Sequence, residues 1–203
     1  MPNGNNLAHA TSRRSRKKQR TRRAILEATR QLATHSPLSA LSVEAISEAA
    51  DIARATFFLH FPTKASLRVA LEEELVAEFV EAVDSTPGRS PERLRAGLAR
   101  MFAWGASAGD VLHASLAVRG NSAGPLLAAL EAFVRGGQRR GDLRRDLPPE
   151  RMARALAGAI GGMLGDGRAG ETGGGEARCD EVLGVLLRGM GESKPRLKWS
   201  AGR

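Results

Sequence analysis

Cysteine and aromatic residues are scarce in this chain of 203 residues, and tyrosine is absent. Cys179 is the only cysteine, so no internal disulfide can form and no CxxC pair is available for a metal or redox site. Aromatic residues make up 4% of the sequence, so Leu, Ala, Val and Ile must fill the core. Because Ala and Leu favour helices and few windows show the β-branched clustering of strands, the composition predicts an all-α fold.

Motifs of catalysis and of membrane insertion are missing as well. The four histidines and the cysteine show no metal-ligand spacing, and the sequence has no HExxH, GxSxG or phosphate-loop pattern. No apolar run approaches the length of a membrane span, and the basic N-terminus is not followed by the apolar stretch of a signal peptide. We therefore expect a cytoplasmic protein that is not an enzyme, stays off the membrane and needs no cofactor or metal.

Positive charge, in contrast, is abundant and unevenly distributed. The net charge is +9, and residues 1–65 hold eleven basic and four acidic residues, which leaves +2 for the rest. The run from Arg13 to Arg23 contains eight basic residues and no acid. This asymmetry predicts a polyanionic partner for the N-terminal part of the chain. Charge alone would fit RNA or an anionic membrane surface as well as duplex DNA.

Apolar periodicity, proline and glycine divide the chain into helices. Residues 1–18 lack this periodicity and are expected to form a disordered basic arm, and residues 191–203 a flexible tail. Ser42 and Thr63 are expected to cap helices, and Ser36-Pro37 to end the first one. The helices, about nine in total, are expected at about 19–35, 43–50, 53–60, 64–84, 91–107, 109–118, 123–137, 148–165 and 177–190.

The segment from Ser42 to Leu67 has the pattern of a helix-turn-helix, in which two short helices flank a break near Asp51-Ile52. Over about Arg22–Leu71 it resembles the TetR family of bacterial regulators. The resemblance rests on an amphipathic first helix and on the order and spacing of Ser42-Val43, Ile46, Ala50, Ala53, Thr56, Phe61-Pro62-Thr63-Lys64 and Leu67. It implies an N-terminal three-helix DNA-binding head over residues 19–66, joined to a helical bundle over 67–190 that binds a ligand and dimerises.

Five positions depart from the family pattern. Asp51 stands where the family usually has the turn glycine, and Asp tolerates the left-handed conformation better than most residues. Ala53 replaces the usual serine cap of the second helix of the motif, and Ala55 replaces a usual glycine. Phe58 and His60 replace two usual tyrosines, of which the first often bonds phosphate, so we expect the affinity to depend more on Lys64, His60 and the basic arm.

The resemblance assigns the contacts with DNA. Ser42 and Lys64 would bind phosphates, and Arg54 and Thr56 are the best candidates for base edges, since arginine to guanine is the commonest specific pairing. Two alternatives stay open, because Ser42 could serve only as a helix cap and the Thr56 hydroxyl could bond its own backbone. The basic arm could be a solvated tail, although we favour contact with phosphates or the minor groove. The predicted DNA-binding set is Arg22, Ser42, Arg54, Ala55, Thr56, Phe58, His60 and Lys64.

Specific binding by such a head usually needs two copies related by a two-fold axis, so we expect a homodimer on a palindromic operator in double-stranded DNA. Apolar stripes in the last two helices predict the dimer interface, or else intramolecular core, at Leu156, Ile160, Leu164, Val182 and Leu186. The resemblance also implies a small-molecule effector, and the larger side chains of the body predict its pocket, or else ordinary core, at Met101, Phe102, Trp104, His113, Leu116, Phe133 and Met163. The expected function is a repressor that the effector releases from its operator; an activator or a ligand-independent regulator is the alternative.

Overall fold

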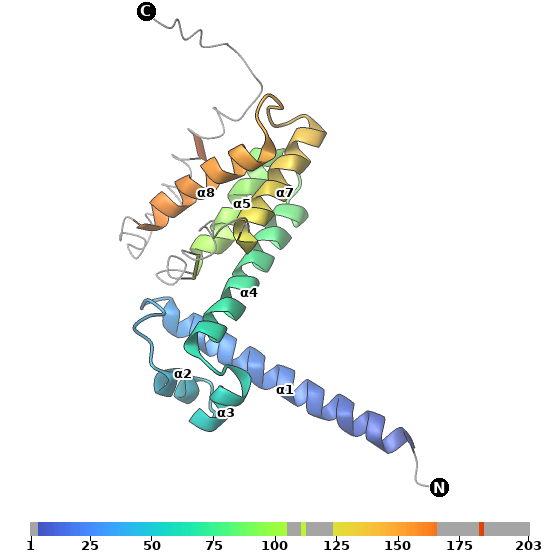
Figure 1. Cartoon of the computed structure of the whole chain (residues 1–203), viewed down its shortest axis with the longest axis vertical. Helices are drawn as coiled ribbons and strands as arrows, with labels where there is room; N and C mark the ends of the chain where they lie inside the picture. The colour runs from blue at the N-terminus through green and yellow to red at the C-terminus, as the bar shows by residue number, and fades with distance from the viewer. Residues whose placement is uncertain (1–3, 105–110, 113–123, 166–182, 185–203) are drawn as a thin grey trace, which may run out of the picture.

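The computed structural model describes residues 4–104, 111–112, 124–165 and 183–184, and all regular structure in these ranges is helical. One end of the molecule holds three helices, and four more form a bundle (Figure 1). The three are α1 (Gly4–Ala33), α2 (Val43–Ala49) and α3 (Arg54–His60). The four are α4 (Lys64–Ser85), α5 (Ser90–Phe102), α7 (Pro125–Arg140) and α8 (Pro149–Gly165).

Local capping explains where most of these helices begin and end. Ser42 accepts a hydrogen bond from the Ala45 backbone N–H and caps α2, as predicted. Thr63 and Ser66 form a reciprocal capping box at the start of α4, which confirms Thr63 as the cap. Gly141 ends α7 with a φ of 86°, a left-handed conformation that glycine adopts without steric cost.

The first helix is much longer than expected. Residues 4–18, which the sequence analysis assigned to a disordered arm, form the first half of α1. This half of the helix projects away from the rest of the molecule (Figure 1), and residues 14–18 are exposed, so an apolar face is not needed there. No proline interrupts residues 4–33, and extending an existing helix costs far less than starting one.

A single hydrophobic core runs from the three-helix end into the bundle, and α4 carries it. Leu67 and Leu71 lie at the head end of α4, and Leu75, Phe79 and Val83 continue the same buried stripe toward α5 and α7. α4 packs along α5, and α7 packs along α8. The head is therefore fixed to the body by one long helix.

The helices predicted at about 91–107, 123–137 and 148–165 correspond to α5, α7 and α8. The two predicted at 109–118 and 177–190 lie mostly outside the described residues, of which 111–112 and 183–184 are helical. The predicted tail over 191–203 also lies outside them. Within the described ranges, no helix is long and apolar enough to cross a membrane.

Candidate DNA-binding face

The turn between α2 and α3 is built on Asp51. Its φ of 51° makes it the one non-glycine residue with a left-handed backbone in the described part of the chain. The turn is closed by two backbone hydrogen bonds, from Asp51 N–H to the Glu48 carbonyl and from Ile52 N–H to the Ser47 carbonyl, both of 3.0 Å. The expectation that aspartate would take the place of the turn glycine is confirmed.

Aromatic packing holds α3 against the other helices of the head. Phe57 is fully buried, and its ring lies 5.9 Å from that of Phe61, which is buried as well. Ile46 of α2 and Ile25 of α1 complete this core without exposed surface. Because Phe57 points inward, the positions on either side of it in α3 face solvent.

Ala53 starts α3 without a side-chain cap, as the sequence indicated. Arg54, the first residue of α3, contacts two neighbouring side chains. Its guanidinium lies 2.6 Å from the Glu44 carboxylate on α2, and both side chains are more than half exposed. It also lies over the Phe58 ring, 5.6 Å from the centroid. An exposed ion pair of this kind contributes at most about 1 kcal/mol, so Arg54 can exchange it for another anionic or polar partner at little cost.

The two predicted phosphate ligands, Ser42 and Lys64, both have structural partners. The exposed Ser42 hydroxyl accepts the Ala45 N–H at 3.0 Å, so its role as a cap is established. The Lys64 ammonium donates to the Ser39 carbonyl at 2.8 Å and ties the start of α4 to the loop before α2. An ammonium carries three donors, so this bond leaves Lys64 able to donate to a phosphate as well.

Arg22 and His60 join α1 to the end of α3. The Arg22 guanidinium stacks on the Phe61 ring, 4.4 Å from its centroid. Burial, followed by the charges of Lys18 and Arg22, holds the pKa of the His60 imidazole below its usual value, so this side chain is neutral at pH 7. His60 Nδ1 is buried and has no hydrogen-bond partner among the described residues. His60 is thus closer to a packing residue than the sequence suggested.

Ala55, Phe58 and Leu59 form the exposed face of α3, and Thr56 is only half-exposed beside them. The sequence analysis missed Leu59, whose side chain is 78% exposed, the most of any large hydrophobic residue described. Phe58, its neighbour on α3, is 39% exposed. Spacing along α3 would have found Leu59, because residues 55, 58 and 59 share one face of a helix.

The basic residues 14–20 of α1 are all exposed. A helix with side chains is about 10–12 Å wide, whereas the minor groove is about 6 Å wide, so this half of α1 does not fit into a minor groove. Of the two expected modes, contact with phosphates is the one compatible with the structure.

A family model of bacterial regulatory proteins, the tetR family, matches residues 25–71, which span the buried part of α1 through the first turns of α4. This part of the chain is therefore a regulatory-protein domain of the tetR family. The match ends near the point where α4 leaves the head, so it covers the helix-turn-helix and its support. No curated protein matches the sequence.

Solved structures share the fold of this chain beyond the head. One, described as the molecular basis for control of antibiotic production by a bacterial hormone, aligns with a TM-score of 0.65 at 22% identity over 85% of this chain and 98% of its own. A TetR-family regulator from Agrobacterium tumefaciens gives 0.61 at 18% over 86% and 99%. FadR from Bacillus subtilis, in complex with stearoyl-CoA, gives 0.60 at 17% over 83% and 98%. At these identities the likeness concerns the fold.

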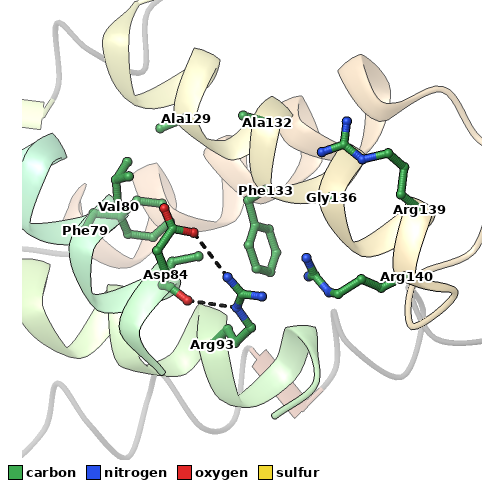
Figure 2. Close-up of a pocket in the computed structure, with 11 residues that line it drawn as sticks. Phe79, Val80, Asp84, Arg93, Ala129, Ala132, Phe133, Gly136, Arg139 and Arg140 are labelled. Atoms are coloured by element: carbon green, nitrogen blue, oxygen red, sulfur yellow. Dashed lines mark hydrogen bonds and ion pairs between the residues drawn. The ribbon is translucent and has the colours of Figure 1, made fainter. Parts of the chain in front are cut away.

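The body of the chain contains a cavity of about 190 Å³ between α4, α5 and α7 (Figure 2). Its walls are mostly apolar, and its mouth carries Asp84, Arg93, Arg139 and Arg140. Arg93 bonds the Val83 carbonyl at 2.8 Å and Asp84 at 3.1 Å, and Arg140 donates to the Ser90 hydroxyl at 3.0 Å. The remaining lining residues are Phe79, Val80, Val83, Ala129, Ala132, Phe133 and Gly136.

Of the seven predicted pocket residues, Phe133 lines this cavity. Met101 and Trp104 are buried in the core instead, where the Trp104 indole N–H donates to Glu78 at 3.3 Å, and Phe102 packs beside them. His113, Leu116 and the Met163 side chain lie outside the described residues. The arginines at the mouth of the cavity were missed because residues far apart in sequence meet at three helix ends. Within the described ranges, no cluster of histidine, cysteine or carboxylate side chains could hold a metal ion.

The stripe of α8 predicted to face a second copy faces the interior of the chain. Leu156 and Ile160 are buried, with exposures of 0% and 1%, so the intramolecular alternative is correct for these two residues. Leu164, Val182 and Leu186 lie outside the residues whose side chains are described. The exposed face of α8 carries the small residues Ala155, Gly158 and Gly162 instead.

Proposed function

We propose that this chain is a homodimeric transcriptional regulator of the cytoplasm that binds a palindromic operator through α3. The observation that carries the proposal is the helix-turn-helix, with its exposed α3 face beside the exposed cations of α1. A helix of this kind enters the major groove, and flanking cations bind phosphates. Arg54 and Thr56 would then contact base edges, and Arg22, Ser42 and Lys64 the backbone.

We further propose that it acts as a repressor released by a small effector, since occupancy of a promoter by a bound dimer blocks transcription directly. A cavity of about 150 Å³ accommodates benzene, so the 190 Å³ cavity suits a ring-sized molecule. The stearoyl-CoA found with FadR is far larger than this. The arginines at the mouth favour an anionic effector, such as a small aromatic carboxylate. An activator of the same architecture is the alternative, and a reporter gene behind the operator separates the two.

The decisive experiment is a binding titration of the full chain against the DNA upstream of its own gene and against scrambled DNA of equal length. A regulator binds the first more tightly at physiological salt, whereas equal affinity for both would contradict the proposal. Adding benzoate and neutral benzamide to the same titration tests the effector, because release by benzoate alone is the expected result.

Arg54→Ala is expected to relax sequence preference at one position of each half-site, at a cost of about 1–3 kcal/mol. Lys64→Ala, which removes a cation without a base contact, is expected to weaken binding by the same factor for all sequences. The Arg54 side chain is more than half exposed and Lys64 is partly exposed. Both variants should therefore stay folded, which melting curves check. Selection from a random DNA pool measures the preference; an unchanged preference for Arg54→Ala would remove this residue from the reading set.

The exposed face of α8 is the best candidate for the dimer interface. A Cβ built on Gly158 or Gly162 meets no described atom within 4 Å, so two copies of α8 could approach closely along this face. Gly158→Glu adds bulk and charge at the point where a two-fold axis would bring the same residue of both copies together. We expect this variant to sediment as a monomer and to lose selective DNA binding.

Ala128→Glu serves as the matched control for the dimer, because Ala128 is an exposed small residue on α7 and the charge change is the same. Neither substitution should lower the thermal stability of the monomer, since each places glutamate, a good helix former, at an exposed position. A Gly158→Glu protein that remains dimeric would exclude this face of α8.

A further inference from the structure

Four large hydrophobic side chains are exposed in the described part of the chain, and two of them, Phe58 and Leu59, are neighbours on α3. With Ala55 they form a continuous apolar face, because positions 55, 58 and 59 lie together on one side of a helix. Isolated exposed hydrophobics are ordinary, but a leucine left 78% exposed near the C-terminal end of a binding helix, beside a second exposed hydrophobic, is available for a partner.

The polar groups of α3 flank this apolar face. Arg54 starts the helix, where it is paired with Glu44 at 2.6 Å and lies over the Phe58 ring, and it can exchange this exposed ion pair for a base edge. Thr56 is half-exposed, and His60 is partly buried at the other end of the helix. A base edge that approaches α3 between Arg54 and His60 therefore meets Ala55, Phe58 and Leu59.

We infer that α3 recognises thymine methyl groups, with Leu59 as a further specificity-determining residue beside Arg54. Among the base-pair edges of the major groove, the C5 methyl of thymine is the apolar group that such a face can contact. The helix-turn-helix selects duplex DNA as the occupant, because its second helix enters the major groove, and the charge of +7 on the first 65 residues, with Lys18 and Arg22 near the end of α3, suits the phosphates. This inference rests on the proposed function and adds the class of base that the head reads.

Deoxyuridine tests the inference at the level of one methyl group, because it keeps the pairing and the phosphates of thymidine and lacks only that methyl. The bound sequence is first selected from a random duplex pool with the full chain, and thymines in the selected half-sites are then replaced one by one by deoxyuridine. Loss of a buried methyl is expected to weaken wild-type binding about fourfold at each contacted position. Leu59→Ala should bind thymine-containing DNA more weakly and lose the discrimination between thymine and uracil at its position.

Val69→Ala is the matched control, because Val69 is also an exposed aliphatic residue, at 45%, but lies on α4. It should keep the wild-type response to deoxyuridine. Because Leu59 is exposed, the Leu59→Ala protein should stay folded, and a melting curve checks this. Two results would overturn this inference and leave the proposed function intact. One is selective binding in which deoxyuridine in place of thymine does not change the affinity, and the other is selection of sites that contain no thymine. Absence of any sequence selectivity would overturn the proposed function and this inference with it.

Discussion

Replacing Arg14 and Lys18 together by glutamine should weaken DNA binding about sixtyfold per head at 0.1 M salt and reduce the salt dependence of log K by about 1.8. Both side chains are exposed on α1. They share a face with Arg22, because positions 14, 18 and 22 are four residues apart. The charges of Lys18 and Arg22 act on His60 at the end of α3, so this face of α1 looks toward the recognition helix. Each phosphate contact contributes about 0.9 to the slope of log K against log salt concentration, and titrations between 50 and 200 mM salt measure it.

Arg20→Gln with Arg23→Gln is the matched control for this pair. It removes the same charge from exposed positions of the same helix, but residues 20 and 23 lie on the far side from 14 and 18. A much smaller change in slope is expected for the control. Equal slopes for the two double variants would show that α1 contributes only a diffuse positive field, and unchanged slopes for both would show that it does not reach DNA.

Features encoded by residues close in sequence were predictable. Capping by Ser42 and Thr63 depends on the N–H groups three residues further along, and the turn at Asp51 depends on the left-handed tolerance of one side chain. Apolar residues at helical spacing account for the inward positions of the helix-turn-helix, where Ile46 and Phe57 are buried. These signals, together with the family pattern, were enough to locate the head and its candidate reading helix.

Features that depend on tertiary partners were not predictable. The apolar stripe of α8 specifies a buried face, but periodicity cannot tell the core of the chain from a second copy, and Leu156 and Ile160 belong to the core. Arg54 and Glu44 lie on different helices, and they meet because the turn at Asp51 sets the angle between α2 and α3. The exposure of Leu59 also depends on how α3 packs against the other helices, and an exposed apolar residue on this helix can contact a thymine methyl as specifically as a polar group contacts a base edge.

Gly137→Ala is expected to destabilise the body by up to about 2 kcal/mol, the balance of an overpacking cost of about 1–3 kcal/mol and a gain of about 1 kcal/mol in helix propensity. A Cβ on Gly137 would lie 2.5 Å from the Ser90 hydroxyl oxygen and 2.6 Å from Leu143 Cδ1. Neither atom can retreat easily. Ser90 is fully buried, and its N–H donates to Asp142 at 2.6 Å, while Leu143 is buried and its N–H bonds the Gly137 carbonyl.

Gly136→Ala, one residue earlier on α7, is the control for this prediction. A Cβ there meets only the Arg140 guanidinium at 3.2 Å among the described atoms, and the end of a long exposed side chain can move away. Gly136→Ala should therefore be neutral or more stable than the wild type by up to about 1 kcal/mol, through helix propensity alone. Urea unfolding at equal protein concentration measures both changes, since association would otherwise shift the apparent stability. Equal stabilities of the two variants would mean that Ser90 and Leu143 move aside for a Cβ on Gly137 without cost, which would contradict the prediction.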